Sequence, residues 1–296
     1  MTFNPNADVS TSKAVHRSRG ARNTGCGVGV VGVIVLLVSL FTGHNFTGLT
    51  PMITGMIGSD EGQVSTTSES VIEDCATGQD ANEDDACRLA ASQLALDDYW
   101  TQQVKGYTPA TMIIYDGSTM SACGQANNSV GPFYCPADQG VYIDPAFFQI
   151  MRRDFGASAG NLAQIYIVAH EWGHHIQNIT GISDAHSGRA SGADSDSVRI
   201  ELQADCFAGA FIKDMTTTTD VNGQPYLLEP TKEQLVDALN AAASVGDDHI
   251  QEQATGRVQP ESFTHGTSEQ RQKWFMSGYT GGVDGCDTFA VSGSQL

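Results

Sequence analysis

Basic residues are scarce in this chain of 296 residues. It has 15 lysines and arginines against 34 aspartates and glutamates, which gives a formal net charge of −19 at pH 7. Because proteins bind nucleic acid largely through Lys and Arg, this balance argues against nucleic acid as a partner. An acidic surface instead favours solubility in an extracytoplasmic space and attracts cationic segments of a substrate.

The sequence also lacks any pair of cysteines at the Cys-x-x-Cys spacing of structural zinc sites, so cysteine ligation of zinc is the disfavoured alternative. Six of the seven cysteines follow residue 43, and an even number in an extracytoplasmic chain predicts disulfides. Pairing of neighbours is the simplest of the fifteen connectivities that six cysteines allow. The predicted disulfides are Cys75–Cys87, Cys123–Cys135 and Cys206–Cys286.

Charge is absent from residues 25–43, which are rich in Val, Leu and Ile. This stretch is at the short end for a membrane-spanning helix but sufficient. Basic residues precede it and acidic ones follow, so the positive-inside rule predicts a cytoplasmic N-terminus. No small-x-small cleavage site follows, which favours an uncleaved anchor over a signal peptide. We therefore expect a disordered, basic cytoplasmic tail (1–24), a transmembrane signal anchor (25–43), a linker (44–70) and an extracytoplasmic domain (71–296) at the cell membrane.

One stretch of the acidic body, residues 170–174, reads His-Glu-x-x-His. The apolar residues around it recur every three or four positions, which predicts a helix with one buried face and both histidines on another. Two imidazoles one turn apart suit Zn²⁺, and Glu171 between them can reach a metal-bound water as general base. We expect His170 and His174 to be zinc ligands; the alternative is a pair of surface histidines. Gly173 lies on the side of His170, which predicts that a facing helix approaches closely.

A candidate third ligand follows in residues 199–209. Glu201 and Asp205 are one turn apart beside an apolar helical stripe, where carboxylates are costly unless a cation neutralises them. We expect Glu201 to be the third zinc ligand and Asp205 to orient a ligand imidazole; a solvated carboxylate pair is the alternative. The ligand set His-Glu-x-x-His-x-x-Gly-x-x-His is excluded, because Gln177 and Thr180 replace its Gly and its third His.

Residues 170–177 together with 201–206 resemble the bacterial family of neutral zinc metallopeptidases known as YpfJ-like proteins. Further stretches that resemble the family are Cys123-Gly124, residues 131–136, 141–144, 263–266 and Gln270-Arg271. The resemblance covers roughly the last three quarters of the chain. It implies a membrane-anchored enzyme with a zincin-type domain that binds one zinc ion per chain.

His265 is a further candidate catalytic residue, in a predicted loop just before a helix. A peptidase needs a group that stabilises the oxyanion formed on the scissile carbonyl, and a loop histidine can serve. The structural alternative is a histidine that caps the helix or contacts Arg271. Residues 142–144 are either an edge strand that binds an extended substrate or a core strand.

Predicted strands come first and helices dominate after them, so we expect a mostly helical α+β domain with a small sheet, as in zincins. The predicted strands are 111–115, 131–135 and 140–144, and the predicted helices are 83–104, 145–155, 161–179, 197–215, 231–243 and 268–277.

The expected function is zinc-dependent endopeptidase activity on a protein or peptide substrate, with Glu171 as general base. One alternative is a non-hydrolytic metal-binding assembly or chaperone module at the membrane, which would not need Glu171. The other is a zinc amidase that acts on cell-wall amides.

Overall fold

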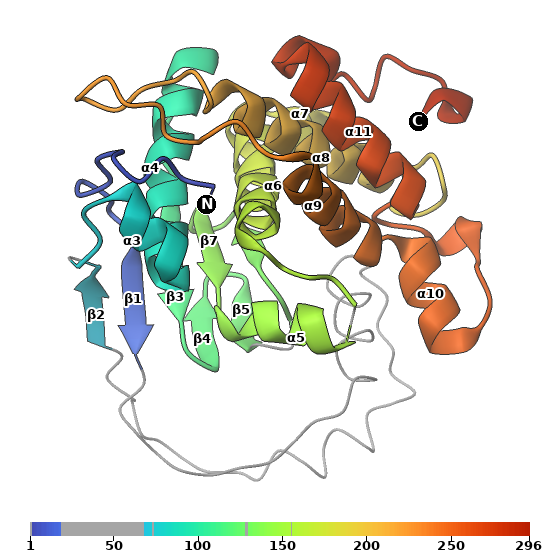
Figure 1. The fold of residues 1–296 in the computed structure, drawn as a ribbon. Coiled ribbons are helices and arrows are strands. Elements are labelled where there is room, and N and C mark those ends of the chain that lie inside the picture. The colour runs from blue at the N-terminus through green and yellow to red at the C-terminus, as the bar shows by residue number, and fades with distance from the viewer. Residues whose placement is uncertain (1, 19–67, 73, 128–129, 155) are drawn as a thin grey trace, which may run out of the picture.

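The computed structural model describes residues 2–18, 68–72, 74–127, 130–154 and 156–296 (Figure 1). The described strands are β1 (Val15–Ser18), β2 (Ser68–Val71), β3 (Thr111–Tyr115), β4 (Ser118–Ser121), β5 (Gly124–Asn127), β6 (Phe133–Cys135) and β7 (Gly140–Ile143). The described helices are α3 (Gly78–Glu83), α4 (Asp85–Gln103), α5 (Ala146–Asp154), α6 (Asn161–Ile179), α7 (Ile182–Ala185), α8 (Asp196–Asp214), α9 (Lys232–Ser244), α10 (Asp247–Thr255) and α11 (Ser268–Gly281). The expected α+β fold with small sheets is confirmed in this part of the chain.

The larger sheet has the strand order β2-β1-β3-β7-β6. Strands β1, β3 and β7 run parallel to one another, and β2 and β6 run antiparallel to their neighbours at the two edges. Strands β4 and β5 form a separate two-stranded sheet. Because β7 lies between β3 and β6, and Tyr142, Ile143 and Asp144 are buried, residues 142–144 belong to the core and β6 is the edge strand.

The first residues of the chain belong to this domain, so the predicted disordered tail is wrong for residues 2–18, which we call the N-terminal arm. Strand β1 is paired on both sides, and Phe3, Ala7 and Val9 are fully buried. The side-chain oxygen of Asn82 accepts the backbone N–H groups of Thr2 and Phe3. The polar composition of the arm wrongly predicts disorder. Other segments of the fold satisfy its backbone hydrogen bonds, and its few apolar side chains fill the core.

The predicted anchor 25–43 and most of the predicted linker lie outside the described residues. Among the residues that the structure does describe, none forms a helix with the length and apolar character that crossing a bilayer requires. Ser18 and Ser68, which flank the segment 19–67, are partners in the register of β1 and β2. The segment therefore begins and ends at neighbouring positions of one sheet.

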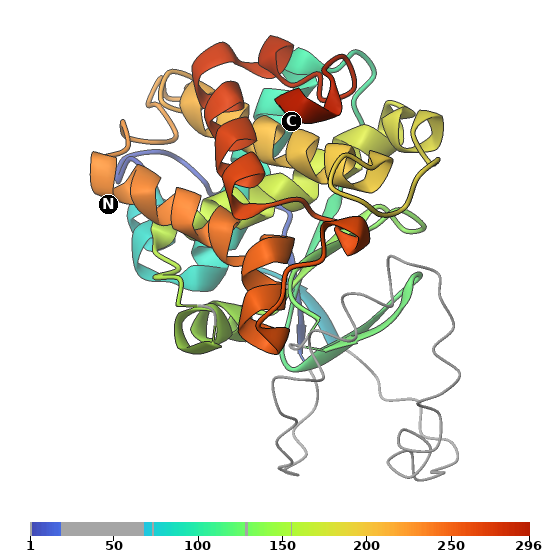
Figure 2. The ribbon, with the colours of Figure 1, turned by 90° about the vertical axis from the view of Figure 1, so that its right-hand side faces the viewer.

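Helix α8 packs against both α6 and α11. Figure 2 shows α11 crossing α8. A Cβ atom on Gly173 would lie 2.9 Å from the Cα of Ala204, which confirms the predicted close approach of α6 and α8. A Cβ on Gly209 or Gly278 would overlap backbone atoms across the α8–α11 contact. The three helices therefore lie nearly backbone to backbone, and short side chains can join them.

The three predicted disulfides, Cys75–Cys87, Cys123–Cys135 and Cys206–Cys286, are all present. The last of them ties α8 to the C-terminal segment. Because α8 carries Glu201, this bond restrains the helix that bears a candidate ligand.

Candidate metal centre

The two helices α6 and α8 bring the three predicted zinc ligands together. His170 Nε2 lies 3.2 Å from one carboxylate oxygen of Glu201, and His174 Nε2 lies 3.5 Å from the other. The three ligand atoms all lie within 4.8 Å of one another, and no other such cluster of three exists among the described residues. Ser195 caps the start of α8 by accepting the N–H of Val198, and Gly181, with a φ of 75°, follows the end of α6.

Each ligand imidazole has an acceptor on its other nitrogen. His170 Nδ1 lies 2.8 Å from Asp205 Oδ1, and His174 Nδ1 lies 2.9 Å from Gln177 Oε1. A carboxylate or amide oxygen on Nδ1 keeps a proton on that nitrogen, so Nε2, which faces Glu201, is the nitrogen left to bind a metal. The structure thus brings Asp205 into contact with His170, a candidate ligand.

Sequence reasoning missed the contact of Gln177. The amide nitrogen of Gln177 donates to the carbonyl oxygen of Ile200 at 2.7 Å and to Gln203 at 3.1 Å, which turns its oxygen toward His174. The spacing of Gln177 could have predicted this contact, because a residue three positions after the second histidine lies on the same face of the helix.

Asp205 is neutralised by Arg271 of α11. The guanidinium donates to both carboxylate oxygens, at 2.8 and 2.9 Å, and the hydroxyl of Tyr166 donates to Oδ1 at 2.5 Å. All three side chains are buried. Burial disfavours the charged carboxylate, but Arg271 and then His170 outweigh it and hold the pKa of Asp205 below its ordinary value. Arg271 therefore contacts the carboxylate that orients His170, and no contact with His265 is needed to explain its position.

Glu171, the predicted general base, feels the charges of both His170 and Glu201. Burial raises the pKa of its carboxyl to about 7, against the opposing influence of His170 and of the backbone N–H of Tyr134, which donates to it. Tyr134 lies on the edge strand β6, and its hydroxyl accepts a hydrogen bond from Asn178 of α6 at 2.8 Å. Strand β6 therefore contacts α6 at Glu171 and again at Asn178.

Burial and neighbouring charges shift the pKa values of the three candidate ligands. Burial lowers the pKa of His174, so this imidazole is neutral at pH 7. Burial also opposes the charge of Glu201, but His174, His265 and His170 hold the pKa of this carboxyl well below its ordinary range. Burial disfavours protonation of His170 as well, yet Asp205 raises its pKa to about 10. A metal ion would therefore compete with a proton at His170.

His265 lies in the loop between α10 and α11, in a distant part of the chain. Its Nδ1 lies 2.9 Å from Thr264 Oγ1 and 3.3 Å from Asp247 Oδ1 of α10. Burial lowers the pKa of His265, but Glu201 and Asp247 more than compensate and raise it above the usual value. His265 and Glu201 therefore act on each other electrostatically.

The donor set fits zinc. Two imidazole nitrogens and one carboxylate oxygen, all converging and little exposed, are the ligands of catalytic zinc sites that keep a position for water. The acceptors on both Nδ1 atoms supply the hydrogen bonds that metal-binding histidines need.

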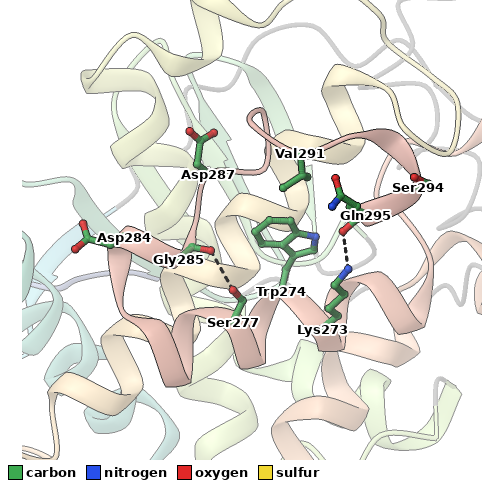
Figure 3. Close-up of a pocket in the computed structure, with 9 residues that line it drawn as sticks. All are labelled: Lys273, Trp274, Ser277, Asp284, Gly285, Asp287, Val291, Ser294 and Gln295. Carbon is green, nitrogen blue, oxygen red and sulfur yellow. Dashed lines mark hydrogen bonds between the residues drawn. The ribbon is translucent and has the colours of Figure 1, made fainter.

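A hollow of about 550 Å³ lies elsewhere, between α11 and the C-terminal segment (Figure 3). Trp274 and Lys273 line it, and Lys273 donates to the carbonyl oxygen of Gln295. None of the residues described above lines this hollow, so it is separate from the metal centre.

Comparison with known proteins agrees with this geometry. The family model "Putative neutral zinc metallopeptidase" matches residues 6–289, a range that includes most of the N-terminal arm. The uncharacterized protein Rv2575 of Mycobacterium tuberculosis is 46% identical over 220 residues, covering 74% of this chain and 75% of that protein. The uncharacterized protein YpfJ of Escherichia coli K12 is 40% identical over 272 residues, covering 88% and 87%. No solved structure matches this chain.

Proposed function

Because this chain belongs to the neutral zinc metallopeptidase family, we propose that it is a zinc-dependent endopeptidase whose zinc ligands are His170, His174 and Glu201. The observation that carries the proposal is the convergence of these three side chains, two of which flank Glu171 in the chain. When bound, zinc supplies a Lewis acid that polarises the scissile carbonyl and acidifies the attacking water.

Glu171 is the proposed general base. It accepts a proton from the attacking water and delivers it to the leaving amine. A carboxyl with a pKa of about 7 is suited to both steps, because it exchanges a proton readily near neutral pH.

Asp205, Arg271 and Gln177 hold the imidazoles in place. Asp205 and Gln177 accept from Nδ1 of the two ligand histidines, and Arg271 balances the buried charge of Asp205. This arrangement fixes the ring orientations before substrate arrives, which lowers the cost of reaching the reactive geometry.

His265 is the proposed donor to the oxyanion that develops on the scissile carbonyl. Its ring is mostly buried and lies within the electrostatic influence of Glu201. A preorganised donor of this kind typically contributes about 10²- to 10³-fold in rate.

We also propose that residues 25–43 hold the enzyme at the cell membrane, with the domain outside the cytoplasm. In this fold, β1 of the N-terminal arm pairs with β2 and β3 in one sheet, so the arm and the domain must lie on the same side of the membrane for the sheet to form. An arm in the cytoplasm would have to leave that sheet. Labelling with a membrane-impermeant thiol reagent tests this in a Cys26→Ser background, with single cysteines at the exposed positions Thr11 and Thr255. Labelling of both positions in intact cells places the arm outside with the domain; labelling of Thr255→Cys alone places the arm inside.

The catalytic proposal is tested on the full chain, because a chain that began at residue 71 would lack β1. Zinc content by elemental analysis and cleavage of a peptide library are measured for the wild type, Glu171→Gln and the control Glu252→Gln, an exposed glutamate on α10. We expect one zinc per chain in all three and cleavage in the wild type and the control only.

Two results would redirect the proposal. Zinc in every variant with no peptide cleavage would favour the non-hydrolytic module, or a zinc amidase if cell-wall amides are hydrolysed instead. Absence of zinc from the gently purified wild type would contradict the site itself.

A further inference from the structure

Asp247, the first residue of α10, organises the loop that carries His265. Its Oδ2 accepts the backbone N–H groups of Thr264, His265 and Gly266 at 2.7, 2.6 and 3.0 Å. The backbone N–H of Asp247 in turn donates to the carbonyl oxygen of Gly266 at 2.9 Å. Gly266 has a φ of +86°, a conformation that glycine adopts most easily, so the loop closes tightly around this carboxylate.

The two oxygens of this carboxylate have different partners. While Oδ2 binds the three backbone groups, Oδ1 faces the imidazole of His265, 3.3 Å from Nδ1. Asp247 is only 8% exposed, so this contact is shielded from water. A residue that only closed the loop would need Oδ2 alone, and the orientation of Oδ1 points to a second role.

The position of the ring supports that role. Nδ1 faces Asp247 and Thr264, so Nε2 lies on the edge of the ring directed away from Oδ1. The charges of His265 and of Glu201, a proposed zinc ligand, act on each other. An acceptor on Nδ1 sets both the tautomer and the orientation of an imidazole.

We propose that Asp247 is a positioning residue for peptide hydrolysis: Oδ1 accepts the Nδ1–H of His265 and thereby directs Nε2 toward the carbonyl of the bound substrate. This inference rests on the proposed peptidase function and adds to it a residue outside the helices that bear the zinc ligands. Asp247 acts through His265 and does not itself touch the substrate.

Asp247→Asn separates the two roles of the carboxylate. The amide oxygen can replace Oδ2 and keep the three backbone hydrogen bonds, while the amide nitrogen replaces Oδ1 and cannot accept from Nδ1–H. The control is Asp248→Asn, because Asp248 contacts Ser268 and not His265. Both variants lose one negative charge from the start of the same helix.

We expect kcat for peptide cleavage to fall about 10- to 100-fold in Asp247→Asn with KM changed by less than about threefold, and to stay unchanged in Asp248→Asn. Zinc content should remain one per chain in both. His265→Ala and the double variant Asp247→Asn/His265→Ala should show equal kcat, since Asp247 acts through the histidine. An unchanged kcat in Asp247→Asn, or losses that multiply in the double variant, would overturn the inference.

A second measurement does not depend on activity. In nitrogen NMR of the imidazole rings, with His265 assigned through the His265→Ala variant, the wild type should show the proton on Nδ1. Asp247→Asn should show a larger share of the form protonated on Nε2, although Thr264 Oγ1 still faces Nδ1. A wild-type ring with no proton on Nδ1 would overturn the inference even if the enzyme cleaves peptides. The predicted tautomers in a protein that cleaves no peptide would instead show that the peptidase proposal has failed while the Asp247–His265 contact stands.

Discussion

The metal helices and the N-terminal arm are both buried in one core, yet only the helices can be recognised in the sequence. Helix α6 shows the three-to-four spacing of an amphipathic helix, and its predicted range of 161–179 matches the observed Asn161–Ile179. Strand β1 has four residues, Val-His-Arg-Ser, with no alternation that marks a buried strand. Hydrophobic periodicity in a sequence therefore identifies elements that have an apolar face of their own. A strand such as β1, whose formation depends on hydrogen bonds to the strands on either side, shows no such pattern.

The two regions also differ in what they do. The helices carry the proposed zinc ligands and the proposed base, while the arm contributes backbone pairing and side chains that fill the core. Substitutions in the two regions should therefore affect different measurements.

The largest effect should come from Arg271→Met. Removal of the cation leaves Asp205 charged, buried and without its partner, which typically destabilises a protein by about 3–5 kcal/mol. Zinc affinity should fall as well, because Asp205 then loses the contact that holds it against His170. Chemical denaturation and zinc titration measure both, and a variant as stable as the wild type would show that the Asp205–Arg271 pair is not essential.

Phe3→Ala should destabilise the domain by about 3–4 kcal/mol, because Phe3 is fully buried and its removal leaves a cavity. Since the hydrogen bonds and strand pairing of Phe3 join it to Asn82 and Leu227 and not to a proposed ligand, kcat and zinc content of the folded fraction should not change. Val221→Ala is the control, because Val221 is 91% exposed. Equal denaturation curves for wild type and Phe3→Ala would contradict the placement of the arm.

Gln177→Leu should weaken zinc binding about 10- to 100-fold, because the Nδ1–H of His174 loses its acceptor. Gln203→Leu removes a buried amide that contacts Gln177 but no ligand histidine, so it serves as the control. Competition with a chelator of known affinity measures the difference. A similar loss in both variants would assign the effect to packing between α6 and α8.

The smallest effect concerns pH. Burial raises the pKa of Asp97 to about 6 in the folded state, although the hydroxyl of Tyr107 donates to it. The folded protein therefore keeps a proton that the unfolded chain releases near pH 4, so the free energy of unfolding falls as pH rises from about 4 to 6. Asp97→Asn should remove this loss and be about 1–2 kcal/mol more stable than the wild type at pH 7, but no more stable at pH 4. Denaturation curves across this range test it, and parallel pH dependences would contradict the assignment to Asp97.

Much of the fold could be predicted where a segment has an apolar face of its own. Predicted strand 111–115 matches β3, and predicted helix 197–215 matches α8 within one residue at each end. The hairpin of β4 and β5 was missed because it buries few side chains, and α10 because its only large aliphatic side chain is Ile250.

The residues of the candidate site likewise fall into those that the sequence could predict and those that it could not. His170, Glu171, His174, Glu201 and Asp205 lie on two helices with regular spacing, so their convergence could be anticipated. The partnership of Arg271 with Asp205 joins residues 66 positions apart, and that of Asp247 with His265 joins residues 18 apart through a loop. Contacts of this kind are created by tertiary packing and leave no local pattern in the sequence.

Anomalous scattering at the zinc absorption edge, from crystals of the full chain grown with zinc, tests the central claim most directly. The account predicts one strong peak about 2.0–2.2 Å from His170 Nε2, His174 Nε2 and a carboxylate oxygen of Glu201. A zinc peak bound to other side chains, with none between α6 and α8, would contradict it.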